Sequence, residues 1–256
     1  MAVTFTNEGP IGFITLDHPP ANSYDLAFMT EYSDAVDEAT AGATRVVLVQ
    51  SANPKFFSAG ADIKRFLEGD VEANMEMIRV SQDAFRRMAA APQVFIAYIA
   101  GHALGGGLEI TLACDIRLAA AGSYKLGLPE VTLGLLPGNG GTQRLTRLIG
   151  PSRALELLIT GRTFGVDEAK AFGLVADVYD ADGAEQQVRT YAERLATGPA
   201  LAIAAIKRCV HEGGGKTLDE GLALEAELME LLFRSQDADE GLHAFVEKRK
   251  PEFAGA

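Results

Sequence analysis

The sequence of 256 residues has little that would suit a secreted, membrane-spanning or nucleic-acid-binding protein. Only two cysteines occur, Cys114 and Cys209, both within apolar stretches, so we expect no disulfide framework and a reducing compartment. A total of 23 Lys and Arg against 35 Asp and Glu gives a net charge of −12, so the basic face needed for nucleic-acid backbones is lacking. Residues 1–16 show no cationic, apolar secretion signal, and the most apolar stretch, 94–108, is interrupted and too short to cross a bilayer. We therefore expect a cytoplasmic chain without membrane or nucleic-acid partners.

What is present indicates a folded globular protein. Hydrophobic residues make up 48% and charged residues 23% of the chain, far from the composition of disordered segments. This length is enough for one large domain with a substantial core, or one domain with an appendage.

The first two thirds of the chain alternate between strand and helix patterns. Turn residues between two apolar runs predict an opening hairpin, and four consecutive apolar residues at 46–49 predict a strand covered on both faces. Alternation of strand and helix in this order predicts an α/β core. Strands are predicted at 3–6, 11–16, 45–51, 94–100 and 115–119, and helices at 25–41, 71–90 and from about 107.

The last part of the chain reads only as helices. They are predicted at 200–211, 218–233 and 237–250. The segment 218–233 is too apolar for a helix that faces water, so we expect it to pack on the core or on another subunit. We divide the chain into a core of residues 1–198 that carries the active site and a helical module of residues 199–256.

Several common site motifs are absent or incomplete. The histidines are scattered, and no Cys/His cluster has metal-binding spacing, so we expect no metal site. Residues 215–217 imitate the end of a phosphate-binding loop, but Val210 stands where that loop needs a glycine. No Gly-x-Ser-x-Gly nucleophile motif occurs.

Two glycine-rich segments follow directly after predicted strands. In residues 56–64, Asp62 can cap a following helix and leave main-chain N–H groups facing outward, although a simple tight turn fits as well. In residues 100–109, three consecutive glycines are costly inside a helix, so we place them at its start, where N–H groups suit a developing oxyanion. Close packing of the helix on a strand is the alternative explanation for these glycines.

A third segment, residues 127–142, holds one isolated carboxylate. Glu130 stands in an otherwise uncharged, glycine-rich stretch, and Glu109 lies between Leu108 and Ile110. Burial raises the pKa of such groups and makes them candidates for proton transfer. Two carboxylates beside two sets of free N–H groups form a catalytic constellation.

Together these segments resemble the enoyl-CoA hydratase/isomerase (crotonase) family. The motifs AGADIK (59–64), ALGGGLE (103–109), LPE (128–130) and LLPGNGGTQRL (135–145) are specific in combination, and the resemblance covers nearly the whole chain. It implies a spiral α/β fold of stacked β-β-α turns, with a C-terminal helical module that makes trimers, often paired into hexamers. The match looks close to short-chain enoyl-CoA hydratases.

The resemblance also implies a role for each matching residue. The N–H groups of Ala61 and Gly106 would hold the thioester oxygen, and one such donor is typically worth about 3 kcal/mol in the transition state. Glu109 would deprotonate the attacking water, Glu130 would exchange a proton with the α-carbon, and the Gly138 N–H would help to hold the water. No metal or organic cofactor is implied, since coenzyme A is part of the substrate.

Both carboxylates favour a hydratase, because an isomerase that moves a proton between carbons typically manages with the second. The expected reaction is reversible syn addition of water to trans-2-enoyl-CoA in acyl-CoA catabolism. An isomerase or another enolate reaction is the alternative, and a non-catalytic acyl-CoA- or RNA-binding relative is a remote one.

The resemblance further implies a coenzyme A site that offsets the acidic total by local charge. One segment at 55–64 and one near the C-terminus contribute to this site. For each of the lysines in them, a solvated surface role is about as common as a role in ligand binding. The residues 23–25 and 66–74 depart from the family pattern, and we expect both to shape the acyl pocket. The implied coenzyme A-binding residues are Lys55, Ala59, Asp62, Ile63, Lys64, Phe245 and Lys248.

Overall fold

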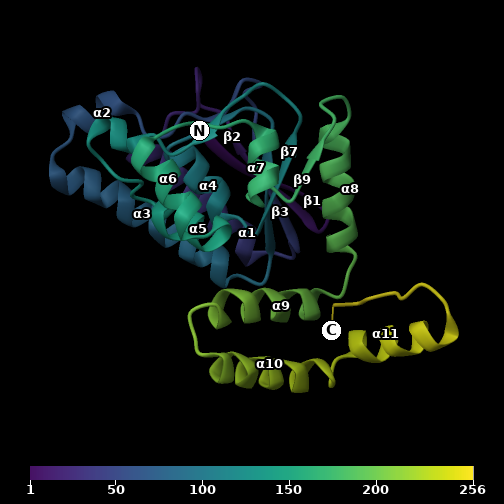
Figure 1. Ribbon diagram of the computed structural model, residues 1–256. Coiled ribbons are helices and arrows are strands. Elements are labelled where there is room, and N and C mark those ends of the chain that lie inside the picture. The colour runs from purple at the N-terminus through teal and green to yellow at the C-terminus, as the bar shows by residue number, and fades with distance from the viewer. Residues whose placement is uncertain (256) are drawn as a thin grey trace.

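The structure, a computed structural model, describes residues 1–255 (Figure 1). Within the core, a strand of one sheet is followed closely by a strand of a second sheet and then by a helix. This happens twice in full, at β3-β4-α2 and β5-β6-α4, and again at β7-β8. These turns confirm the predicted spiral of β-β-α units. The strands are β1 (Val3–Glu8), β2 (Ile11–Leu16), β3 (Val46–Ser51), β4 (Phe56–Ser58), β5 (Val94–Ile99), β6 (His102–Leu104), β7 (Ile116–Ala120), β8 (Leu126–Gly127) and β9 (Asp177–Tyr179).

The first sheet has six strands in the order β1-β2-β3-β5-β7-β9, and the second has three in the order β4-β6-β8. The predicted hairpin of β1 and β2 is antiparallel, and the other neighbours pair in parallel. Alternate residues of β3 enter two different apolar clusters: Val47 and Val49 on one face, Val46 and Leu48 on the other. The sheet is therefore buried on both faces, as a run of four apolar residues predicts.

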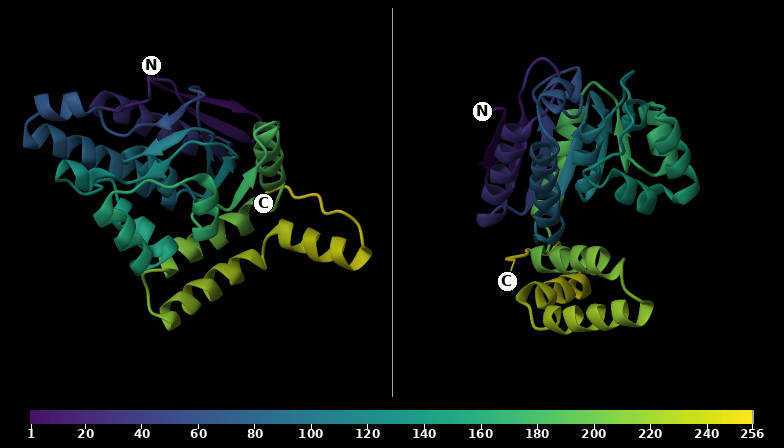
Figure 2. Two further views of the ribbon diagram at one scale, coloured as in Figure 1. Left: turned by 45° about the horizontal axis from the view of Figure 1, so that its top comes forward. Right: turned by 90° about the vertical axis from the view of Figure 1, so that its left-hand side faces the viewer.

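The helices of the core lie around these sheets (Figures 1 and 2). Helix α8 packs on the face of the large sheet that carries Val46 and Leu48, and α1, α3 and α4 pack on the other side. No helix within residues 1–255 is long and apolar enough to span a membrane. These helices are α1 (Leu26–Ala41), α2 (Ile63–Glu68), α3 (Val71–Ala90), α4 (Gly106–Ala113), the 3-10 helix η1 (Glu130–Leu133), α5 (Gly141–Ile149), α6 (Pro151–Thr160), α7 (Val166–Phe172) and α8 (Ala184–Ala196).

Three further helices extend from one end of the core: α9 (Ala200–Gly213), α10 (Leu218–Leu232) and α11 (Gln236–Glu247) (Figures 1 and 2). Helix α9 is fixed by Lys207, whose Nζ donates to the carbonyls of Met88 and Gln93 and pairs with Asp115 at 2.9 Å. The predicted helix 237–250 ends earlier, at Glu247, because Lys248 adopts a left-handed conformation with φ 56°.

The apolar helix α10 is only partly covered in the single chain. Leu224 and Leu228 are buried, and α10 packs against α9. Leu222, Leu231 and Phe233 are exposed. Of the two expected covers, the core of the same chain does not cover these three side chains. A second subunit remains the predicted cover.

Candidate active site

The first element of the site is the main chain around Ala61. Tyr24 N donates to the Gly60 carbonyl at 3.0 Å, and Asp62 N donates to the Tyr24 carbonyl at 2.8 Å, which makes a parallel bridge between Tyr24 and Ala61. In such a bridge the N–H of the middle residue points to the opposite side. Ala61 N donates to no residue within 1–255, so its N–H is free for a ligand. Asp62 then caps α2, because its side chain accepts from Lys64 N at 2.9 Å.

The second element is the start of α4, where the three glycines lie. Gly105 is the N-cap with φ 55°, and Gly106 begins the helix with an N–H that has no acceptor within residues 1–255. A Cβ on Gly60 would lie 3.2 Å from Gly106 N, so the residue before Ala61 packs directly against that amide. A Cβ on Gly107 would lie 2.3 Å from the Ser58 carbonyl oxygen. The close-packing explanation therefore holds at Gly107, while the Gly106 N–H is left available for an acceptor outside the chain.

Glu109 lies one turn into α4 with its carboxylate inside the protein. It is 2% exposed, and its Oε1 accepts hydrogen bonds from Asn139 N at 2.7 Å and Gly141 N at 2.6 Å. Burial is the main cause that raises the pKa of Glu109 to about 8, and the charge of Glu130 adds to it.

Glu130 begins η1 and reaches the same place from another segment. Its Oε1 lies 3.0 Å from the position that a Cβ on Gly105 would occupy, and its buried Oε2 has no hydrogen-bond partner within residues 1–255. Burial raises the pKa of Glu130 to about 7. An unpaired buried carboxyl oxygen is costly in a folded protein, so it indicates a group kept for a ligand or a proton.

Both carboxylates and both free amides line one cavity of about 250 Å³. Its lining combines polar and glycine residues with several apolar side chains, which suits a ligand with a reactive carbonyl and a hydrocarbon chain. The Gly138 carbonyl accepts from Gln82 Nε2 at 2.7 Å, which fixes the loop that carries the Gly138 N–H. Further lining residues are Tyr24, Ala59, Ile63, Phe66, Met77, Ile78, Leu133, Leu135, Leu136, Gly138 and Asn139.

The predicted coenzyme A-binding residues divide into two groups. Ala59 and Ile63 line the cavity, while Lys55 and Lys64 are exposed and form no ion pair with any described residue. Asp62 follows Ala61 in the same loop and is half-buried.

The other group lies elsewhere in the single chain. Phe245, which is 84% exposed, belongs to α11, and Lys248 caps that helix. Helix α11 and the helix α2 that borders the cavity lie at opposite ends of the molecule in Figures 1 and 2. The structure thus does not bring Phe245 and Lys248 to the cavity of their own chain.

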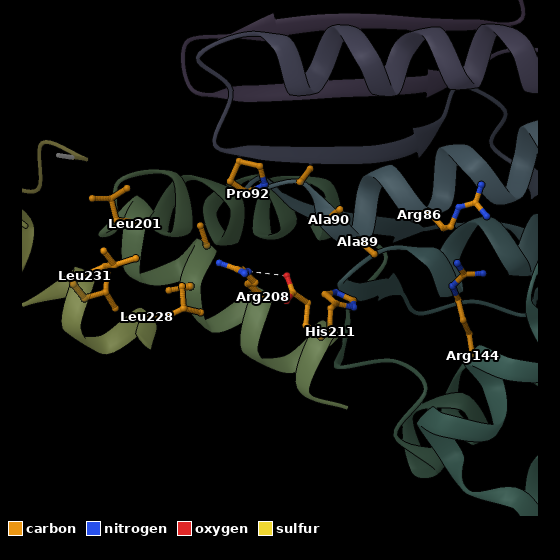
Figure 3. A pocket seen from close by; sticks show the side chains of 15 residues that line it. Arg86, Ala89, Ala90, Pro92, Arg144, Leu201, Arg208, His211, Leu228 and Leu231 are labelled. Carbon is orange, nitrogen blue, oxygen red and sulfur yellow. Dashed lines mark hydrogen bonds and ion pairs between the residues drawn. The ribbon is translucent and has the colours of Figure 1, made fainter. Parts of the chain in front are cut away.

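A larger cavity of about 520 Å³ lies between the end of α3 and the helices α9 and α10 (Figure 3). Its apolar side chains include Leu201, Leu228 and Leu231, and Arg208 Nε is paired with Glu212 at 2.7 Å. Neither Glu109 nor Glu130 lines it. This cavity lacks the acid pair that defines the smaller one.

The sequence singled out neither of two polar residues of the smaller cavity, Tyr24 and Asn139, although segment 23–25 was expected to shape the acyl pocket. Asn139 Nδ2 donates to the Tyr24 hydroxyl at 2.8 Å, and both side chains are buried. The only signal was indirect: Tyr24 belongs to the segment 23–25 that departs from the family pattern. Tyr24 and Phe66, one from each departing segment, line the cavity.

Comparisons with known proteins agree with this geometry. A family model described as enoyl-CoA hydratase/isomerase matches residues 6–256. A probable enoyl-CoA hydratase of Bacillus subtilis is 37% identical over 99% of both chains, and a crotonyl-CoA hydratase of Syntrophomonas wolfei is 35% identical over 98% of this chain and 97% of its own. The crystal structure of an enoyl-CoA hydratase from Bacillus anthracis superposes with a TM-score of 0.95 at 37% identity, covering all of both chains.

The fold and the site define an α/β protein in which one cavity brings together two carboxyls and two free main-chain N–H groups. The chain belongs to the enoyl-CoA hydratase/isomerase family, as its motifs predicted.

Proposed function

We propose that this protein is an enoyl-CoA hydratase that adds water reversibly, with syn geometry, to trans-2-enoyl-CoA and gives 3-hydroxyacyl-CoA in acyl-CoA catabolism. The observation that carries the proposal is the convergence on one cavity of two free main-chain amides, Ala61 N and Gly106 N, with two carboxyls, the buried Glu109 and the half-buried Glu130. The reaction needs this set, and it needs neither a metal nor an organic cofactor.

In this proposal the thioester oxygen accepts hydrogen bonds from Ala61 N and Gly106 N. Glu109 takes a proton from water held with the help of Gly138 N–H, and the water oxygen bonds to the β-carbon. The π electrons of the double bond shift toward the thioester, and negative charge develops on the oxygen that the amides stabilise. Glu130 then gives its proton to the α-carbon. Atoms balance, since one water is added and the proton that leaves Glu130 is replaced on Glu109.

The proton inventory bears on the direction of the reaction. With pKa values of about 8 for Glu109 and about 7 for Glu130, the pair holds one proton, mainly on Glu109, between about pH 7 and about pH 8. Dehydration needs the proton on Glu109, whereas hydration needs it on Glu130. Hydration by this mechanism therefore starts from the less populated of the two one-proton states.

The wider site rests on the same proposal. Lys55, Ala59, Asp62, Ile63 and Lys64 contact the coenzyme A portion from the same chain. Because α11 lies far from the cavity, Phe245 and Lys248 reach the nucleotide portion from a neighbouring subunit.

A homotrimer, or a dimer of trimers, is the assembly we propose, with the exposed side chains of α10 covered between subunits. We propose a cytoplasmic location without nucleic-acid partners. Free Cys114 and Cys209 and the net charge of −12 are in keeping with both.

The test is a comparison of 2-enoyl-CoA and 3-enoyl-CoA substrates with the purified chain. We expect loss of the enoyl-thioester absorbance with crotonyl-CoA, and incorporation of one solvent deuterium at the α-carbon in D2O. Turnover of 3-enoyl-CoA alone, with Glu109 dispensable, would favour the isomerase. Salt-sensitive RNA retention with no activity on any acyl-CoA would favour a non-catalytic protein.

A further inference from the structure

Tyr24 connects all three loops that build the cavity. Its main chain forms the bridge that turns the Ala61 N–H away from it, through the bonds to Gly60 and Asp62. Its ring lies beside Phe28, with ring centroids 6.2 Å apart, and is buried. The side chain of the residue that shapes the first oxyanion loop thus continues into the centre of the site.

The hydroxyl of Tyr24 ends against the second loop. A Cβ built on Gly106 would lie 1.5 Å from the Tyr24 hydroxyl oxygen, so this oxygen occupies the space that any other residue at 106 would need. The Tyr24 hydroxyl thus contacts the same residue whose main-chain N–H is the second oxyanion donor of the proposal. Contact with Tyr24 therefore limits how far the start of α4 can approach the Ala61 loop.

The third loop is joined through Asn139. The side chain of Asn139 donates to the Tyr24 hydroxyl at 2.8 Å, and the main-chain N–H of the same residue donates to Glu109 Oε1 at 2.7 Å. The Asn139 carbonyl accepts from Arg144 Nη1 at 2.8 Å, which fixes the peptide further. Tyr24 is thus one residue removed from the carboxylate that activates water.

We propose that Tyr24 is a positioning residue of the hydration reaction: its hydroxyl, held by Asn139, fixes the Gly106 amide and the Glu109 carboxylate in the geometry that the transition state needs. The inference rests on the proposed hydratase function. It assigns a role to a segment, residues 23–25, that the family pattern does not explain. A small displacement of reacting groups costs up to about a hundredfold in rate, so the effect should appear in turnover.

The informative variant is Tyr24→Phe, which keeps the ring against Gly106 and removes only the oxygen. We expect kcat for crotonyl-CoA to fall roughly 10- to 100-fold while KM changes less than about threefold. The matched control is Tyr32→Phe, because Tyr32 is also a buried tyrosine of this region and its hydroxyl contacts Met88 Sδ at 3.4 Å, away from the cavity. Its kcat should stay at the wild-type level.

Asn139→Ala, alone and combined with Tyr24→Phe, tests whether Tyr24 acts through its hydrogen bond with Asn139. Asn139→Ala keeps the main-chain N–H to Glu109, so it should lower kcat to the level of Tyr24→Phe, and the double variant should lose no more than either single change. If the loss of kcat in the double variant equalled the product of the two single losses, Tyr24 and Asn139 would act independently, and the proposed coupling would be overturned.

Other outcomes are equally decisive. Wild-type kcat in Tyr24→Phe, or an equal loss in Tyr32→Phe, would overturn the assignment of Tyr24 even in an active hydratase. A wild-type chain without activity on enoyl-CoA would instead refute the proposed function.

Discussion

Glu109 and Glu130 face one cavity with unequal hydrogen-bond partners. Glu109 Oε1 accepts from two main-chain amides, whereas the buried Oε2 of Glu130 accepts from none within residues 1–255. These two hydrogen bonds fix the orientation of the Glu109 carboxylate, which suits a base that must hold a water molecule. The free oxygen of Glu130 suits a group that meets the substrate carbon directly.

Replacing either carboxyl by its amide should stop proton transfer with little change in shape. Glu109→Gln and Glu130→Gln should each lower kcat for crotonyl-CoA by about 10²- to 10⁴-fold, the usual contribution of a positioned acid or base. Calorimetric titration with butyryl-CoA should show that affinity largely survives. Near-wild-type hydration by either variant would contradict the proposed roles.

The pH dependence of turnover should be bell-shaped. Since the pair must carry one proton, and the pKa values are about 7 and about 8, kcat/KM should be highest between these values and fall on both sides. Initial rates of crotonyl-CoA hydration across the pH range check this. A flat profile through this interval would argue against a shared proton.

Stability should also depend on the ionisation of Glu109. Its pKa is raised from 4.5 in the unfolded chain to about 8 in the folded one, so the folded state binds more protons between these values and stability falls as pH rises through them. The melting temperature of Glu109→Gln should therefore rise relative to wild type between about pH 5 and about pH 8.

Glu240 supplies the control for that experiment. Hydrogen bonds from Arg249 lower its pKa to about 2, so its contribution is lost only as the pH falls below its ordinary value of 4.5. The difference between Glu240→Gln and wild type should stay constant over the same interval. An equally constant difference for Glu109→Gln would show that its carboxyl does not titrate there.

Gly106→Ala adds only one methyl group, but we expect it to lower activity strongly. The new methyl would lie 1.5 Å from the Tyr24 hydroxyl oxygen, so the start of α4 or Tyr24 must move and the amide at 106 moves with it. We expect a fall in kcat/KM of about 100-fold or more. The control is Gly42→Ala, where a Cβ meets nothing within 4 Å, and it should keep full activity.

The contact between α9 and the core should depend on Lys207. Its side chain is 6% exposed and pairs with the Asp115 side chain, which is 13% exposed, so Lys207→Met removes the cation beside a largely buried carboxylate and should cost about 3 kcal/mol of unfolding free energy. Arg208→Met removes the exposed pair with Glu212 and should cost about 1 kcal/mol or less. Denaturant titration compares the two, and equal losses would contradict the anchoring role.

Much of the fold could be predicted because local patterns agree with it. The hairpin, the helix that Asp25 caps and the strand at 46–51 lie close to where periodicity and turn residues placed them. The short strands β4, β6 and β8 were not predicted, because two or three residues are too few to show an alternating hydrophobic pattern. They pair with one another only because the spiral stacks them. Strand β9 was missed for the same reason.

The site was predictable where chemistry marks the residue. Glu109 and Glu130 stand out as lone carboxyls in apolar sequence, and burial does raise the pKa of both. Tyr24 and Asn139 did not stand out, because a tyrosine and an asparagine occur widely and their bond spans 115 residues of chain. The distance of Phe245 and Lys248 from the cavity of their own chain could not be predicted either, because it depends on how α11 is placed, and no local pattern encodes that.

Because the oxyanion donors that we propose are peptide N–H groups, nearly every side-chain exchange leaves them in place. Proline at position 61 would be the sole genetically encoded replacement that strips a hydrogen from that peptide nitrogen. Other substitutions there can only tilt or crowd the donor, whereas Phe66 and Ile78 line the cavity with side chains that are only half-buried and so tolerate exchange better than core residues. Under the proposed function, new acyl groups would thus be accepted without touching the charge-stabilising half of the site.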